Sequence, residues 1–222
     1  MLAFLATFNS RLNRNGHSPG EFAHAGLMDR LRAGNPDLAT LLHDINAGLK
    51  PYAAWRNDDG SITAGLVTRP VIEAFRAGCS DARVEAMVSL TELWEKAQPK
   101  GDRIALHFVL PTCWRFSGQF HVLPEPRLVF LPLATLWHKV GGAALPVIEI
   151  KEIVCAYMNG QSRKVEYPQR GYWLAGFVGQ VEYRIGKLPD DQQRACWALA
   201  HFAEFTGVGY HTGRGMGRVM VK

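Results

Sequence analysis

The chain opens with an apolar run at Leu2–Phe8, which is typical of a buried strand. A polar stretch follows, and then Ser18, Pro19 and Glu21 introduce a segment with helical spacing of its apolar positions. A serine that caps, a proline at the first helical position and a glutamate three residues after the serine form a helix start signal. The sequence therefore predicts a strand and then a helix that Gly34 ends.

The rest of the first half continues with short elements separated by polar turns. The expected elements are a helix over 35–48 begun by Asn35 and Pro36, strands at Tyr52–Trp55 and Ile62–Val67 joined by the turn NDDG, a short helix at Pro70–Ala77 stopped at Gly78, and a strand at Arg83–Leu93. The stretch QPKGD at 98–102 is polar and contains both Pro and Gly, which favours a domain boundary.

After this boundary the same order of elements returns. The expected elements are a strand at Arg103–Leu110, a helix at Pro132–Val140 ended by Gly141 and Gly142, a strand at Val147–Tyr157, a turn at NGQS, a strand at Trp173–Ile185, a helix at Pro189–Phe205 and a last strand at Val219–Val221. Each half has the order β-α-β-β-α-β, the split βαβ motif. The sequence predicts an α+β fold of two tandem ferredoxin-like domains, at 1–98 and 103–222.

Composition narrows the class of protein only slightly. The 222 residues carry a net charge of +5 with a pI of about 9.1, a modest basic excess that favours an anionic partner. The four cysteines, Cys79, Cys113, Cys155 and Cys196, are far apart and form no C-x-x-C pair, which argues against a zinc or thioredoxin-like site and fits a reduced, cytoplasmic protein. No apolar run approaches the ~20 residues that span a bilayer, and MLAFLATFNSRL is expected to be a strand, since it lacks a signal-peptide cleavage pattern.

Near the carboxyl end, FTGVGYHTGRGMGRVMVK holds five glycines within eleven residues. A dinucleotide-binding reading fails, because the glycine spacing is wrong and only five residues follow Gly217, too few for a βαβ unit. A Walker loop needs lysine after its glycine, and Gly213 is followed by Arg214. Neither nucleotide-binding motif is present.

The same segment has features that suit an extended phosphate backbone. Glycines allow close approach of a partner, His211, Arg214 and Arg218 add cationic donors, and Tyr210 adds an aromatic face. The alternative is a flexible surface hairpin whose charges are incidental. The residues alone leave both interpretations open.

Several stretches together resemble a known family. These are GVGYHTGRGMGRV, NPDLATLLHDINAGLKPY, HFVLPTCWRFSGQFHVLPEPRLVFLPLATLWHKV, and GFVGQVEYRI followed by LAHFAEFTGVG. In this order they are similar to motifs of the CRISPR repeat-processing endoribonucleases, the sixth Cas family of the RAMP superfamily. The resemblance implies two ferredoxin-like domains that hold RNA, no cofactor, and metal-independent cleavage of CRISPR precursor RNA within its repeats. The expected products are a 2′,3′-cyclic phosphate and a 5′-hydroxyl.

Such a cleavage requires groups that deprotonate the 2′-oxygen, protonate the 5′-oxygen and stabilise charge on the phosphate. The resemblance places the general acid/base at His43, which lies outside the apolar stripe expected from Leu38, Leu41, Leu42 and Ile45. Lys50 is expected to stabilise the phosphate. The first-helix tyrosine of some family members is missing, since no tyrosine precedes Tyr52. His24 shares a face with Leu27, Met28 and Leu31, which favours a packed histidine, yet it is the best substitute.

The expected RNA contacts form a larger set. They are Arg11, Arg14, Arg115, Arg163, Lys164, Arg170, Gly207, Gly209, His211, Gly213, Arg214, Gly215, Gly217 and Arg218. Surface charges without a ligand are the alternative for many of the cations. The expected partner is CRISPR repeat RNA, and other Cas proteins or a second copy of the chain are further candidates. A non-catalytic RAMP subunit and a double-ferredoxin protein for an unrelated ligand are the competing hypotheses.

Overall fold

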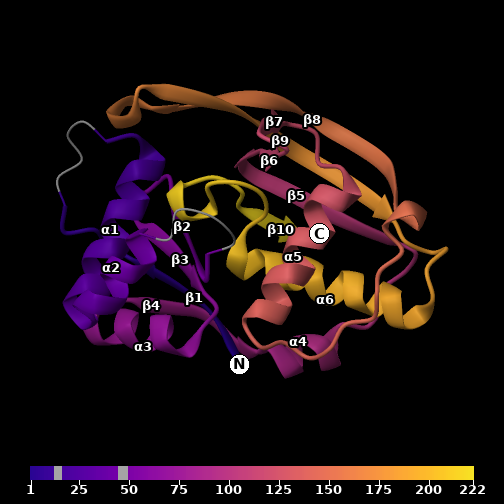
Figure 1. The fold of residues 1–222 in the computed structure, drawn as a ribbon, viewed down its shortest axis with the longest axis horizontal. Helices are drawn as coiled ribbons and strands as arrows, with labels where there is room; N and C mark the ends of the chain where they lie inside the picture. Colours follow the sequence, from indigo (N-terminus) through magenta and orange to yellow (C-terminus); the bar gives the residue numbers. More distant parts are fainter. Residues whose placement is uncertain (13–16, 45–49) are drawn as a thin grey trace.

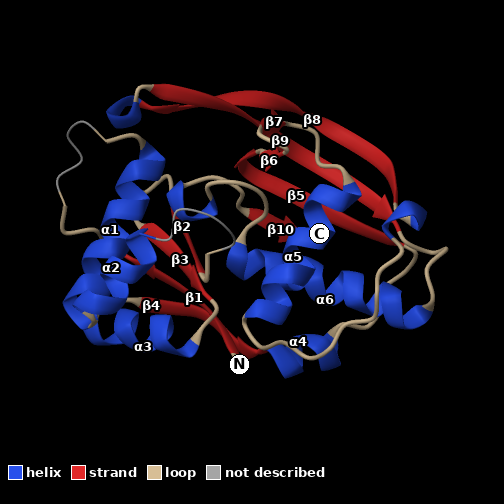
Figure 2. Ribbon diagram, in the orientation of Figure 1, coloured by secondary structure: helices blue, strands red, loops and turns tan. Residues whose placement is uncertain are grey.

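The computed structural model describes residues 1–12, 17–44 and 50–222, and two four-stranded antiparallel sheets dominate it (Figures 1 and 2). The strand order is β2-β3-β1-β4 in the first sheet and β10-β5-β9-β8 in the second. Both orders are those of a split βαβ unit, in which each crossover helix returns the chain beside a strand already present. The predicted fold of two tandem ferredoxin-like units is confirmed.

The elements of the first half are β1 (Leu2–Phe8), α1 (Pro19–Gly34), α2 (Pro36–Asp44), β2 (Tyr52–Arg56), β3 (Ile62–Leu66), α3 (Arg69–Gly78), β4 (Arg83–Ser89) and α4 (Leu90–Lys96). The capping box that opens α1 is present: the Glu21 amide donates to Ser18 Oγ at 3.3 Å, and the Ser18 amide donates to the Glu21 carboxylate at 3.1 Å. The Leu38 amide donates to Asn35 Oδ1 at 3.0 Å, so Asn35 caps α2 as expected.

The elements of the second half are β5 (Arg103–Thr112), β6 (Trp114–Phe116), β7 (Gln119–His121), α5 (Pro126–Lys139), η1 (Ile150–Glu152), β8 (Val154–Tyr167), η2 (Pro168–Arg170), β9 (Tyr172–Arg184), α6 (Asp190–Thr206), η3 (Thr212–Arg214) and β10 (Val219–Val221). Two of these differ from the expected bounds at the start. Helix α5 begins at Pro126 and accommodates Pro132 in its interior. The residues at 147–153, expected as strand, precede β8, and Ile150–Glu152 among them form η1.

Two expected elements are wrong in kind. The strand expected to reach Leu93 stops at Ser89, because Ser89 and Glu92 form a second capping box that starts α4. The turn expected at NGQS is absent, and residues 159–162 lie inside the continuous strand β8, paired with β9. The chain reverses instead at η2, where Gly171 adopts the left-handed conformation with φ of 69°.

The two halves share a hydrophobic core. One cluster of buried apolar side chains combines Ala3 and Val67 of the first half with Phe108, Trp137 and Phe202 of the second. Helix α6 contacts strands of both sheets. The two halves also meet where α4 packs against α6, since Arg194 of α6 donates to the Trp94 carbonyl at 2.8 Å. The division into domains at 1–98 and 103–222 stays a prediction.

The β8–β9 ribbon extends beyond its sheet toward the first half and passes above the glycine-rich loop (Figure 1). At its tip, the Gln169 side chain lies 2.9 Å from His17 Nδ1, just before α1. The Tyr167 hydroxyl donates to the Arg214 carbonyl at 3.2 Å. The ribbon therefore bridges the second sheet to both α1 and the glycine-rich loop.

The glycine-rich loop, residues 207–218, is docked against the first half. The Gly215 amide donates to the Ala54 carbonyl at 3.0 Å, and Trp55 Nε1 donates to the Met216 carbonyl at 2.8 Å. Gly20 of α1 meets the same loop so closely that a Cβ on it would collide with the Arg214 carbonyl oxygen. Gly215 has φ of 83°, which favours glycine. The loop thus covers the outer edge of β2, at the margin of the first sheet.

Within the part of the chain that the structure describes, no helix is long and apolar enough to cross a membrane.

The contact at Gly20 gives a first prediction. Gly20→Ala should destabilise the protein by about 1–3 kcal/mol, because the new methyl group meets backbone atoms, which cannot move aside by changing rotamer as a side chain can. An alanine in a helix without such a clash would be favourable by about 1 kcal/mol. The measurement is the urea unfolding midpoint.

Gly26→Ala, in the same helix, is the matched control. Its new methyl would meet the ends of the Ile62 and Ser10 side chains, which can move. A Gly20→Ala protein as stable as, or more stable than, Gly26→Ala would contradict the close docking of the loop on α1.

Candidate active site

Two histidines from neighbouring helices of the first half lie close together. His24 lies on α1 and His43 near the end of α2, with ring centroids 6.0 Å apart and ring planes at 31°. His43 is exposed, as the helical pattern predicted, although the apolar stripe that led to this expectation is narrower than assumed. Leu41 is 61% exposed, and among the described residues of α2 the fully buried apolar side chains are Ala39 and Leu42.

His24 is held by the glycine-rich loop. Its Nδ1 lies 3.0 Å from the Gly213 carbonyl oxygen, which can only accept, so Nδ1 carries the proton. Nε2 is buried and has no hydrogen-bond partner within the described residues. Burial, then the charges of Arg214 and Lys50, lower the pKa of His24 from 6.5 to about 3. His24 is therefore a neutral imidazole whose Nε2 lone pair accepts no hydrogen bond from the described residues.

Lys50 reaches the same place from the segment before β2. Its ammonium donates to the Tyr52 hydroxyl at 3.0 Å and to the Leu42 carbonyl at 3.4 Å. The Tyr52 ring in turn stacks on His24 at 6.3 Å between centroids. Burial, followed by the charges of Arg214 and Arg170, lowers the pKa of Lys50. Burial raises the pKa of Tyr52 to about 12, so this hydroxyl remains protonated at neutral pH.

The second half contributes cations and aromatic rings to the same site. Arg214 comes from the glycine-rich loop and Arg170 from the tip of the β8–β9 ribbon. Burial, and then the charges of these two arginines, lowers the pKa of His211 from 6.5 to about 3. No ion pair found among the described residues involves Lys50, Arg170 or Arg214. Three cations that have no acidic partner among the described residues repel one another, and an anionic ligand between them would relieve this repulsion.

A small hollow opens beside the two histidines. It has a volume of about 250 Å³, and Met28, Asp29 and Arg32 of α1 and Leu12 line it together with His24 and His43. The hollow lies on the outer face of α1 and α2, so a ligand in it would contact both imidazoles. This group of residues, with Lys50, Tyr52 and Arg214, is the candidate active site.

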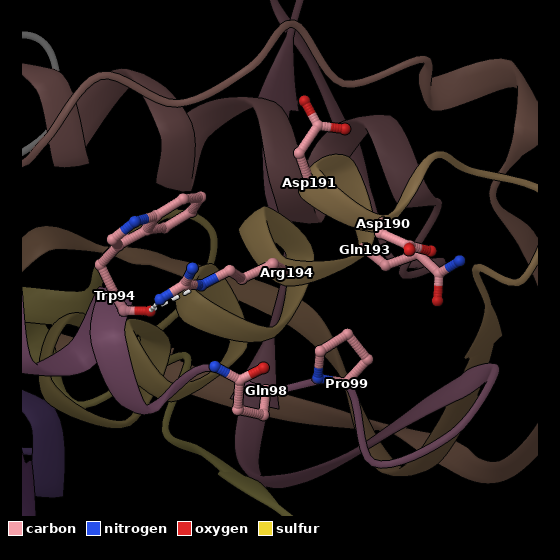
Figure 3. A pocket seen from close by; sticks show the side chains of 7 residues that line it. All are labelled: Trp94, Gln98, Pro99, Asp190, Asp191, Gln193 and Arg194. Atoms are coloured by element: carbon pink, nitrogen blue, oxygen red, sulfur yellow. Dashed lines mark hydrogen bonds between the residues drawn. The ribbon is translucent and has the colours of Figure 1, made fainter.

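A larger hollow, of about 550 Å³, lies elsewhere, between the end of α4 and the start of α6 (Figure 3). Arg194 crosses it and is stacked over the Trp94 ring, 4.7 Å from the centroid. Asp190 and Asp191 lie on its rim. None of the histidines or cations of the candidate active site lines this hollow.

The loop glycines serve the protein's own packing. Added Cβ atoms on Gly207 and Gly217 would collide with backbone carbonyls of the loop itself, and one on Gly209 with the Cys113 carbonyl. A Cβ on Gly213 would lie 2.7 Å from the Tyr52 ring. The flexible surface hairpin considered from the sequence is therefore wrong. The close approach that these glycines permit is made by the chain, and their contact with RNA stays a prediction.

The expected RNA-binding cations are dispersed. Arg218 is engaged internally, since its Nη1 donates to Asn57 Oδ1 at 2.7 Å. Lys164 pairs with Glu166 at 2.7 Å on the exposed strand β8, which also carries Arg163. Arg11 is exposed and lies near Cys79 and Asp81, at the far end of α1 from the glycine-rich loop. Arg115 is exposed on β6, and Arg14 lies outside the described residues.

The sequence pointed to Tyr210 as an aromatic face but gave no role in the site to Tyr52, Tyr167 or Tyr172. The Tyr172 hydroxyl lies 3.5 Å from His211 Nε2, and Tyr167 packs against the same imidazole with centroids 5.2 Å apart. The Lys-Pro-Tyr order at 50–52 was the one available signal, because it brings a lysine and a tyrosine within two residues of each other just before β2.

No group of three or more His, Cys, Asp or Glu side chains is placed to hold a metal ion in the parts of the chain described.

The family model and the curated relatives that match this chain carry the same description. The family model described as CRISPR-associated endoribonuclease Cas6 matches residues 106–219. Curated relatives of the same description from two strains of Mycobacterium tuberculosis are 25% identical over 130 residues, which is 57% of this chain. The matched region spans 41% of the length of these relatives.

Solved structures share the fold over the whole chain. A Cas6 product complex superposes with a TM-score of 0.82 at 20% identity and 100% coverage of both chains. Thermus thermophilus Cas6 gives a TM-score of 0.75 at 20% identity and covers 100% of this chain and 97% of its own. A RAMP protein binding different RNA substrates gives 0.53 at 12% identity, with 100% and 99% coverage.

Because His24 is half-buried and neutral, we predict a loss of stability in acid. Its folded-state pKa of about 3 lies below the unfolded value of 6.5, so only the unfolded chain binds a proton between these values. Stability from this group is full above pH 6.5 and falls by about 1.4 kcal/mol per pH unit below it. His24→Asn should therefore lose less stability than the wild type between about pH 6.5 and pH 5, by about 2 kcal/mol.

Urea unfolding at the two pH values measures this difference. His211 contributes in both proteins, so the comparison isolates His24. An equal loss of stability in wild type and His24→Asn would show that His24 is not held neutral in the folded protein.

Proposed function

The chain belongs to the family of CRISPR-associated endoribonuclease Cas6, and on this premise we propose that it cleaves CRISPR precursor RNA within the repeats. The observation that carries the proposal is the meeting of His24, His43 and Lys50 with the loop cation Arg214, beside a hollow that opens to solvent. Two imidazoles and nearby positive charge are the groups that phosphodiester cleavage by a 2′-hydroxyl requires. The printed descriptions of similar structures, a Cas6 product complex and a Cas6 substrate mimic complex, support RNA as the ligand.

The two histidines differ in environment and so suit different roles. His24 stays neutral, so its Nε2 lone pair can accept the proton of the 2′-hydroxyl as this oxygen forms its bond to phosphorus. Its pKa of about 3 makes it a weaker base than an ordinary imidazole. His43 is exposed and, when protonated, can donate to the 5′-oxygen as the bond from phosphorus to that oxygen breaks. The products are a 2′,3′-cyclic phosphate and a 5′-hydroxyl. His24 thus takes the place of the absent first-helix tyrosine.

The cations stabilise the phosphate. Lys50 is oriented by the Tyr52 hydroxyl, which accepts its hydrogen bond at 3.0 Å. Arg214 and Arg170 lie close enough to lower the pKa of Lys50 and His211, and they come from the loop and the ribbon that close over the first half. An oxygen of the cleaved phosphate that gains negative charge would find this field already in place. Side chains of the protein thus supply the base, the acid and the stabilising charge.

The test is cleavage of the host's repeat RNA in EDTA under single-turnover conditions. Cleavage should persist, and His43→Ala should slow it by about 10²-fold or more, within the range of general acid–base catalysis. His138→Ala is the matched control, since His138 is an exposed histidine near the end of α5. It should cut at the wild-type rate.

A 2′-deoxy nucleotide at the cut site should stop the reaction and leave binding intact, since only the nucleophile is removed. An His43→Ala protein with unchanged rate would overturn the assignment of His43. Tight binding of the repeat by the wild type without cleavage at any pH would overturn the nuclease proposal in favour of an RNA-binding subunit.

A further inference from the structure

A small hairpin beside the glycine-rich loop belongs to neither large sheet. Strands β6 and β7 pair only with each other among the described strands, and Ser117 and Gly118 form their turn with φ of 49° and 79°. Figure 1 shows this hairpin under the β8–β9 ribbon. Phe116 and Phe120, which flank the turn, are each 49% exposed. Two large aromatic rings that are half exposed to water lack the stabilisation that full burial would give. Exposed rings at such a place point to a ligand that covers them.

The rings of the hairpin continue into the candidate active site. Phe120 contacts Tyr210 of the glycine-rich loop with centroids 5.7 Å apart, and Tyr210 contacts His211 at 3.9 Å. His211 contacts Tyr172 at 6.2 Å. Gly213, two residues beyond His211, accepts the hydrogen bond of His24. A continuous row of rings therefore leads from the hairpin tip to the loop that holds the candidate base.

Positive charge accompanies the exposed rings. The Arg115 guanidinium lies over the Phe120 ring, 5.9 Å from its centroid, and that of Arg127 lies over Phe116 at 5.3 Å. Arg127 is also paired with Glu125 at 2.9 Å, whereas no ion pair of Arg115 is found among the described residues. An aromatic surface with a cation at its edge suits a ligand that has both a flat ring and a phosphate.

We propose that Phe120 and Tyr210, with Arg115 beside them, form a stacking platform for unpaired nucleobases of the RNA next to the cleaved phosphate. This inference rests on the proposed function, since it names the RNA conformation that the same site takes. Bases in a duplex already stack on their neighbours and do not offer a free face, whereas unpaired bases do. The occupant is therefore a single-stranded segment.

The experiment measures binding separately from cleavage. The probe is the repeat RNA with a 2′-deoxy nucleotide at the cut site, and its affinity is measured by fluorescence anisotropy. Phe120→Ala should weaken binding about 5- to 150-fold, the range that loss of one base–aromatic contact gives by alanine substitution. Phe120→Trp should restore binding, because it retains a stacking face.

Leu123→Ala is the matched control. Leu123 is 57% exposed just after the same hairpin but has no ring, so its loss should leave affinity unchanged. A second arm replaces single nucleotides near the cut by abasic ones. At the stacked nucleotide, the abasic RNA should bind wild type and Phe120→Ala equally.

The outcomes separate the two proposals. If the wild type neither binds nor cuts repeat RNA, the proposed function fails. If it binds and cuts, and Phe120→Ala binds the probe as tightly as wild type, the platform is overturned and the function stands. If Phe120→Trp is as weak as Phe120→Ala, or if no abasic position removes the difference between the two proteins, stacking is likewise overturned.

Discussion

The docking of the glycine-rich loop on the first half determines the geometry of the site. Gly20 of α1 and Gly215 of the loop bring two backbones together where no side chain fits between them. This approach places the Gly213 carbonyl 3.0 Å from His24 Nδ1. The loop comes at the end of the chain and α1 near its start, so the site exists only when both halves are folded and joined. A backbone contact fixes their relation more rigidly than flexible side chains would.

The electrostatics follow from this packing. Burial at the junction makes a charged imidazole costly, and the nearby guanidinium of Arg214 adds to that cost. The same guanidinium, with Lys50, supplies the field that a phosphate needs. One constraint therefore produces both a neutral imidazole and a group of cations beside it. The β8–β9 ribbon completes the arrangement, since Tyr167 donates to the Arg214 carbonyl and Arg170 lies at the ribbon's tip.

Much of the fold was predictable, because local signals and the fold agree over most of the chain. The Ser18–Glu21 capping box, the turn glycines and the repeated order of elements gave two ferredoxin-like units. Errors arose where a local signal competes with tertiary pairing. NGQS has turn residues, yet it continues a strand because β9 offers a partner along its whole length. Ser89 was read as strand interior although it caps α4.

The candidate site was predictable in part. The resemblance and the helical pattern pointed to His43 and Lys50, and His24 was named as a substitute. The partner of His24 was not predictable, because the Gly213 carbonyl lies 189 residues away and backbone acceptors carry no signature in sequence. The glycines were read as room for a ligand, whereas the chain's own backbone and the ring of Tyr52 take that room. The aromatic row was missed because its members come from β7, the loop and β9.

The measurement that tests this account most directly is nitrogen NMR of the His24 imidazole in the intact protein across a pH titration. The account predicts a neutral ring protonated on Nδ1, with no titration until well below pH 5, since the pKa is about 3. A ring that carries its proton on Nε2, or that titrates near its ordinary pKa of 6.5, would contradict the claim that the glycine-rich loop buries and orients this histidine.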